Sequence, residues 1–180
     1  QRWGSEPVNP RQADRPDRVA DTARERLVGV ALAAGAGRRL APLTLERPKV
    51  LCPVGGRPLL GWALGRLVGV VDEVIVNVHH HAPLVLRWLG HVANTGLHCA
   101  PPTVEFWRAG GDDSPMGSTA PRLIEVGQLG TAAGGAAALL ASVEGPEALG
   151  TAGALAALAG RLDGRAVLAV NADSLIAADL

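Results

Sequence analysis

The chain has no tyrosine, one phenylalanine, one methionine and two cysteines among its 180 residues. Two cysteines, Cys52 and Cys99, are too few for a disulfide scaffold or for a cysteine-based metal cluster. Long apolar runs are missing as well. No stretch approaches the roughly 18 to 20 residues of a membrane-spanning helix, and residues 1–26 hold no apolar segment like that of a signal peptide. We therefore expect a soluble, cytoplasmic protein with no membrane partner.

Net charge is also absent, because 17 basic and 17 acidic side chains cancel. A non-specific nucleic-acid binder needs a basic stripe or patch, so the composition disfavours nucleic acid as a partner. Hydrophobic residues make up 48% of the chain and charged residues 19%, which allows a sizeable core in a single domain. Lysine occurs once, at Lys49, while the other 16 basic side chains are arginines.

Short apolar runs of strand length alternate with segments of helical periodicity. A run buried on both faces is typical of a parallel strand, and leucines recurring three and four residues apart predict helices. Strand–helix alternation at this spacing predicts an α/β fold, a Rossmann-like and mainly parallel sheet flanked by helices. We expect strands over 27–33, 73–78 and 166–172, and helices over 59–69, 82–90 and 149–162.

Two parts of the chain do not follow this alternation. Residues 1–26 are rich in Arg, Asp and Pro and predict a poorly ordered tail, with a short helix near its end. The Gly- and Ala-rich segment at about 99–142 fits the rhythm poorly, although VEFW at 104–107 has strand character. Within it, residues 128–140 weakly echo residues 148–160. We attribute that echo to drift of the coding sequence rather than to a structural repeat.

The first predicted strand runs into a glycine-rich turn, Gly35-Ala36-Gly37, followed by Arg38 and Arg39. Glycines let the backbone approach a ligand closely, and successive N–H groups of a tight turn bind anions. Two arginines and the later Lys49 would supply the positive charge that a triphosphate needs. A Gly-x-Gly alone is equally compatible with a structural turn. A dinucleotide fingerprint is disfavoured because position 40 is Leu rather than Gly, and a Walker sequence is absent.

The whole string at 32–60, LAAGAGRRLAPLTLERPKVLCPVGGRPLL, resembles the signature of the sugar nucleotidyltransferases, LAAGxGTRLxPLTxxxPKxLxPVxGxPLL. The spacing from Arg39 to Lys49 is that of the family, and Arg38 departs from the usual Thr, Ser or Glu. Segments 73–82, 143–155 and 167–175 are similar to the mannose-1-phosphate guanylyltransferase-like and muramate-phosphate uridylyltransferase-like branches. Residues 99–142 have no counterpart, and the second half of the family's domain is missing. On this resemblance, residues 27–180 would be the nucleotide-binding half of a nucleotide-diphospho-sugar transferase fold, incomplete at its C-terminus.

The resemblance implies that an NMP group passes from an NTP (GTP, UTP or dTTP) to a sugar 1-phosphate, giving NDP-sugar and pyrophosphate. Arg39 and Lys49 would be the catalytic cations, and Asp173 would bind Mg²⁺. Nucleotide-binding roles are implied for eight further residues: Ala34, Gly35, Ala36, Gly37, Arg38, Glu144, Gly150 and Thr151. The base, the sugar and a homo-oligomeric state are left open. Catalysis would rest on positioning and charge neutralisation, because phosphoryl-type transfer needs little covalent chemistry from a protein.

Two other classes of protein stay open at this stage. One is a non-catalytic module, or inactive fragment, that binds a nucleotide or nucleotide sugar; the other is a dinucleotide-dependent oxidoreductase domain. Pyrophosphate release separates the transferase from both, and NAD(H) binding would support only the last. We expect the 180 residues to bind an NTP without making NDP-sugar at an enzymatic rate, and to leave an apolar sheet edge beside the last strand. His79, His80 and His81 predict a surface turn, since three consecutive side chains cannot face one metal ion from extended backbone.

Overall fold

Five strands form the main sheet of the computed structural model, which describes residues 27–97, 121–130 and 135–175. The order across the sheet is β5 (Arg122–Gly130), β6 (Ala136–Val143), β4 (Glu73–Val78), β1 (Leu27–Leu32) and β7 (Ala166–Asn171). β6, β4, β1 and β7 are parallel, and β5 runs antiparallel along β6. The sequence therefore predicted the fold class correctly, a mainly parallel α/β sheet.

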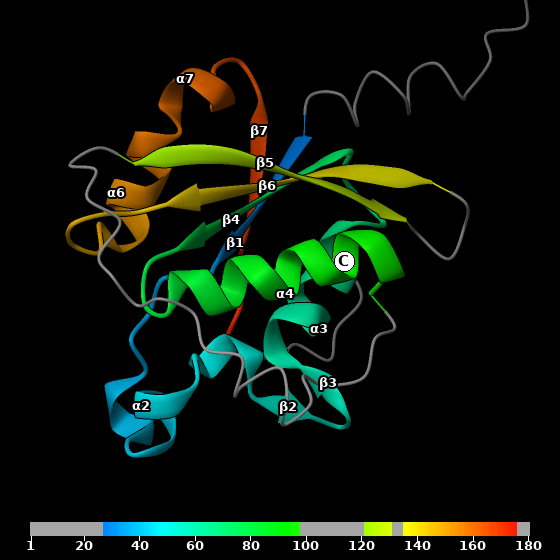
Figure 1. Cartoon of the computed structure of the whole chain (residues 1–180). Helices are drawn as coiled ribbons and strands as arrows, with labels where there is room; N and C mark the ends of the chain where they lie inside the picture. The colour runs from blue at the N-terminus through cyan, green and yellow to red at the C-terminus, as the bar shows by residue number, and fades with distance from the viewer. Residues whose placement is uncertain (1–26, 98–120, 131–134, 176–180) are drawn as a thin grey trace, which may run out of the picture.

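Helices cover both faces of this sheet (Figure 1). α3 (Leu59–Leu67) and α4 (Ala82–Thr95) lie on one face, and α6 (Gly150–Ala157) and α7 (Ala159–Leu162) lie on the other. Short elements connect β1 to α3: the 3₁₀ turns η1 (Arg38–Leu40) and η2 (Lys49–Leu51), the helix α2 (Leu43–Glu46), and the small hairpin of β2 (Pro53–Val54) and β3 (Arg57–Pro58).

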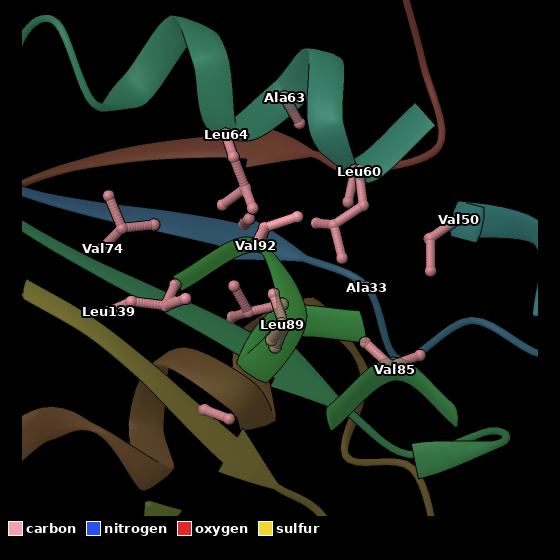
Figure 2. Close-up of a cluster of buried hydrophobic side chains, with 14 of the residues drawn as sticks. Ala33, Val50, Leu60, Ala63, Leu64, Val74, Val85, Leu89, Val92 and Leu139 are labelled. Atoms are coloured by element: carbon pink, nitrogen blue, oxygen red, sulfur yellow. The ribbon is translucent and has the colours of Figure 1, made fainter. Parts of the chain in front are cut away.

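The core has a layer on each side of the sheet because successive strand side chains point to opposite faces. Val74 and Val76 of β4 join the larger cluster, which leucines and valines of α3 and α4 complete (Figure 2). Ile75 belongs to the smaller cluster, together with Val30 of β1 and Leu158 between α6 and α7. Burial on both faces is the reason that β1 and β4 appear in the sequence as continuous apolar runs.

The segment that fits the strand–helix rhythm poorly contributes two strands to the sheet. Residues 122–130 and 136–143 form β5 and β6, which follow each other without an intervening helix and pair in the antiparallel direction. The sequence AAALLASV has few β-branched residues and favours helix. Pairing with β4 on one side and β5 on the other, with burial of most of its side chains, outweighs that preference.

The two similar sequence segments, 128–140 and 148–160, have different secondary structures. Ala136–Leu140 lies in a strand, whereas Gly150–Ala157 is helical, which agrees with drift toward Ala and Gly rather than with a repeat. The helix predicted over 149–162 is divided at Leu158 into α6 and α7, and the one predicted over 82–90 continues to Thr95. The tail at 1–26 and the VEFW segment at 104–107 lie outside the described residues.

Among the described strands, β7 pairs with β1 alone and forms one edge of the sheet. Its side chains are mostly exposed, and Val167 retains 38% of its accessible surface. Among the described residues, β7 is therefore an edge strand with partly exposed apolar side chains.

Candidate active site

A cleft of about 720 Å³ opens at the carboxyl ends of the parallel strands. Loops that follow parallel strands meet at this edge of an α/β sheet, which is where such folds bind ligands. The cleft is lined by residues from the ends of β1, β4 and β7, from the loop after β1, and from the segment that leads into α6: Leu32, Ala34, Gly35, Ala36, Arg38, Asn77, His79, His80, Pro146, Glu147, Ala148, Gly150, Thr151, Asn171 and Asp173.

The loop after β1 carries its glycines where the backbone requires them. Gly37 has a φ of +62°, and a Cβ there would lie 2.9 Å from Cγ2 of Thr44 and 3.1 Å from Cβ of Lys49. Thr44 is buried and its Oγ1 donates a hydrogen bond of 3.1 Å to the Gly37 carbonyl. Gly35 has open space around its Cα and lines the cleft. The loop is thus closely packed at Gly37, against Thr44 and Lys49, and open toward the cleft at Gly35.

Of the three cations singled out in the sequence, Arg38 lines the cleft and Lys49 reaches Asp173. Arg39 is exposed in η1 and lies outside the lining residues. The Lys49 Nζ donates to Oδ2 of Asp173 over 2.8 Å, and both side chains are partly exposed. Two residues 124 positions apart, which the sequence placed in one site, therefore form a direct ion pair.

This ion pair sets the charge state of Asp173. The hydrogen bond from the Lys49 ammonium holds the pKa of the Asp173 carboxyl below its ordinary value, against a smaller effect of burial. The carboxylate is therefore ionised throughout the neutral range. It also accepts a hydrogen bond of 3.2 Å from Oγ of Ser174. One carboxylate at the cleft wall can bind a hard divalent cation together with phosphate oxygens.

Glu144 lies behind the cleft rather than in its lining. It is 4% exposed, its Oε1 accepts from Nδ2 of Asn77, and its Oε2 accepts from the Leu149 N–H, both over 2.8 Å. Gly150, at φ +69°, and Thr151 begin α6 and do line the cleft. Of the three residues singled out in this segment, two face the cleft and the third fixes the chain behind it.

Sequence reasoning missed several polar residues of the cleft, among them Asn77, Asn171 and His80. The His80 and His81 rings both have Nε2 close to the Thr44 carbonyl, at 3.1 and 3.2 Å. His80 therefore lies in the cleft wall and contacts the segment after β1. The prediction of a surface turn did not include these contacts. No group of three potential metal-ligating side chains occurs among residues 27–97, 121–130 and 135–175. Position at the carboxyl end of a strand beside β1 was the available signal for Asn77.

Residues 29–117 match the family model of the MobA-like NTP transferase domain. The chain is 48% identical over 59 residues to the N-acetylmuramate alpha-1-phosphate uridylyltransferase of Caulobacter vibrioides, a match that covers 32% of the chain and 24% of the relative. It is 36% identical over 72 residues to the glucose-1-phosphate thymidylyltransferase of Mycolicibacterium smegmatis, covering 39% and 25%. A third relative, the CMP-5'-(3-aminopropyl)phosphonate synthase of Streptomyces rubellomurinus, is 54% identical over 52 residues, covering 28% and 8%.

These matches span at most about a quarter of each of the three relatives. Within the part of the chain that the structure describes, none of the helices combines the length and apolar character needed to cross a membrane.

Proposed function

We propose that the chain carries the nucleotide-binding half of a site that transfers an NMP group from an NTP to a sugar 1-phosphate, because residues 29–117 match the MobA-like NTP transferase domain and two of the similar relatives are sugar-phosphate nucleotidyltransferases. The observation that carries the proposal is the cleft, whose lining includes the glycine loop, Arg38 and Asp173, with Lys49 paired to Asp173. Residues 27–180 would form this half, and 1–26 would be a tail outside it.

The proposed chemistry is in-line attack of a sugar phosphate oxygen on the α-phosphorus, with pyrophosphate leaving. Backbone N–H groups of Ala34 to Gly37 would hold the triphosphate, since this loop is open toward the cleft at Gly35. Arg38 and Arg39 would neutralise charge on the phosphates as pyrophosphate departs. Arg39 is exposed beside the loop, so its guanidinium is free to swing onto a bound triphosphate.

Lys49 would bridge the attacking phosphate and the α-phosphate. Its ammonium pairs with the Asp173 carboxylate of the cleft wall. When phosphate enters, the ammonium would exchange the carboxylate for a phosphate oxygen without a large movement of the side chain. Positioning of this kind, with little covalent chemistry from the protein, is how phosphoryl-type transfer is accelerated.

Asp173 would hold Mg²⁺, and its fit to that ion rests on its donor chemistry. It is an ionised oxygen ligand at the wall of the cleft, and a cation, the Lys49 ammonium, already lies 2.8 Å from Oδ2. Mg²⁺ suits such a site because it takes one or two carboxylates and completes its shell with water and phosphate oxygens. When bound, the ion would screen the phosphate charges and orient the α-phosphate.

The base would lie against Gly150 and Thr151, where the absence of a side chain at 150 leaves room for a flat ring. The names of the three relatives specify uridylyl, thymidylyl and CMP products, so UTP, dTTP and CTP join GTP as substrates to test. We place the reaction in the cytoplasm, where NTPs are made, and leave homo-oligomerisation to be measured.

The test measures binding of each NTP, with and without Mg²⁺, to the 180-residue chain, together with pyrophosphate release on addition of sugar 1-phosphates. We expect Mg²⁺-dependent nucleotide binding. In a preparation that releases pyrophosphate, Arg39→Ala should lower turnover by about 10²–10³-fold, as for loss of one charge-stabilising donor, with little change in Tm. Arg122→Ala, an exposed arginine on β5, is the matched control. Failure to bind any NTP, or binding of NAD(H) instead, would contradict the proposal.

A further inference from the structure

A buried chain of hydrogen bonds runs behind the cleft and connects segments that line it. Asn77, at the end of β4, and Glu144, just after β6, are 3% and 4% exposed. The Ala33 N–H donates to Oδ1 of Asn77 over 2.7 Å, and Nδ2 of Asn77 donates to Oε1 of Glu144 over 2.8 Å. At the far end, the Leu149 N–H donates to Oε2 of Glu144 over 2.8 Å.

The two ends of this chain are backbone donors, and this dictates which atoms lie between them. Ala33 and Leu149 each present an N–H, so the side-chain atoms facing them must be acceptors. An amide at 77 and a carboxylate at 144 satisfy every hydrogen bond: Asn77 accepts and then donates, and Glu144 accepts twice. Two amides would leave a donor facing a donor in any orientation, and two carboxylates would leave an acceptor facing an acceptor.

The chain of bonds joins three separate segments that line the cleft. Ala33 leads directly into the phosphate loop, and its N–H also lies 3.2 Å from the Asn77 carbonyl, continuing the pairing of β1 with β4. Leu149 leads directly into Gly150 and Thr151, where the base is proposed to lie. At Glu144 the backbone is fixed as well, since its N–H donates to the Val78 carbonyl and its carbonyl lies 3.1 Å from Nδ1 of His79.

We infer that Asn77 and Glu144 are a pair of positioning residues that set the distance between the phosphate loop and the base-facing segment 146–151. The inference rests on the proposed function, because it assumes that a nucleotide spans these two walls. A buried polar pair is stabilising only if all of its hydrogen bonds are made, so one mismatch releases the segment before α6. The nucleotide must then order that segment on binding.

The experiment swaps the amide of Asn77 and the carboxylate of Glu144 between the two positions. Glu144→Gln creates the donor–donor mismatch and Asn77→Asp the acceptor–acceptor mismatch, each without change of size. The double variant Asn77→Asp/Glu144→Gln restores every donor–acceptor pair and the total charge. Asp163→Asn, an exposed carboxylate-to-amide change before β7, is the control. Dissociation constants are measured for the NTP that binds the wild-type chain most tightly and for inorganic triphosphate, which lacks a base.

We expect each single variant to bind the NTP about tenfold more weakly, as for loss of one buried hydrogen bond, and the double variant to regain most of that affinity. Triphosphate affinity should change less in Glu144→Gln, because loss of either hydrogen bond of residue 144 releases the base-facing segment, whereas the backbone bond of Ala33 to Asn77 still holds the phosphate loop. Amide hydrogen exchange at Leu149 should speed up in Glu144→Gln and slow again in the double variant. If Glu144→Gln does not fold, the comparison of Asn77→Asp with the double variant decides.

Single variants that bind the NTP like the wild type, or a double variant as weak as the singles, would overturn the positioning role. Equal loss of NTP and triphosphate affinity in Glu144→Gln would overturn it too, because that pattern indicates general loosening. A wild-type chain that binds no NTP would refute the proposed function instead. Amide hydrogen exchange at Leu149 would then still show whether the Asn77–Glu144 pair fixes the segment before α6.

Discussion

At the scale of single residues, Gly35 and Gly37 meet different physical needs. Gly37 adopts a backbone conformation that L side chains rarely take, and the space behind it is filled by Thr44 and Lys49. Gly35 has no such conformation and no atom within 4 Å of a built Cβ, but it lies on the cleft. We therefore propose that the first glycine serves ligand approach, whereas the second serves the fold of the loop.

This difference predicts that glycine-to-alanine substitutions at the two positions affect stability and nucleotide binding in opposite ways. Gly37→Ala should cost about 2–3 kcal/mol of unfolding free energy, from positive φ together with interatomic distances that are too short. Gly35→Ala should change stability by less than about 0.5 kcal/mol and yet weaken nucleotide binding. Chemical denaturation and NTP titration of both variants test this, and each serves as the control for the other. A stable Gly37→Ala chain would show that the loop is not constrained as described.

At the scale of elements, Glu73 links β4 to α7 and to the connection between α7 and β7. It is the first residue of β4 and is 8% exposed; its carboxylate accepts from Arg161 over 2.6 and 3.1 Å and from Arg165 over 3.0 Å. Burial alone would raise the pKa of Glu73, but the hydrogen bonds and charges of the two arginines hold the pKa below its ordinary value. The tie lies at the sheet end opposite to the cleft, so it acts on stability.

Glu73→Gln should therefore lower the unfolding free energy by about 1–3 kcal/mol at pH 7, a range reduced because Arg161 is 46% exposed. Since the folded-state pKa of Glu73 is depressed, its contribution is complete above the unfolded pKa, near about 4.3, and is lost as pH falls through the folded value. The stability difference between wild type and variant should thus be constant from pH 7 to about pH 5 and shrink below about pH 4. Urea denaturation across pH tests this, with the exposed neighbour Asp72→Asn as control. A difference that does not vary with pH would exclude the ionic tie.

Some of the strands could be predicted from the sequence and others could not. β1 and β4 were predictable because burial on both faces leaves a continuous apolar run. β6 was not, since its alanines and leucines suit helix and only pairing within the sheet makes them a strand. The glycine loop, Lys49 and Asp173 were found through a motif, whereas Asn77 has no signal beyond its place at a strand end. Its role depends on atoms brought together by the fold, 67 positions apart in the case of Glu144.

At the scale of the whole molecule, the ion pair between Lys49 and Asp173 joins the segment after β1 to the end of β7 beside the cleft. Each of the two groups is engaged with the other. A divalent cation alone must displace the Lys49 ammonium from the carboxylate, and an NTP alone brings its negative charge close to Asp173. A cation and a triphosphate together offer each group a new partner of opposite charge, so their binding should be cooperative.

We accordingly expect Mg²⁺ and an NTP to raise Tm much more together than the sum of their separate effects. At about 100 times the dissociation constant, a ligand that binds only the folded state adds about 2.7 kcal/mol, which for a domain of this size is roughly 5–10 °C. Asp173→Asn should remove this cooperative increase while costing less than about 1 kcal/mol by itself, because the ion pair is partly exposed. Thermal melting with Mg²⁺, with NTP, and with both measures the effect in wild type, Asp173→Asn and the control Asp163→Asn. Additive shifts in the wild type, or an undiminished cooperative shift in Asp173→Asn, would show that the pair does not couple the two ligands. Since the pair is partly exposed, raising the salt concentration should weaken the cooperative shift in the wild type.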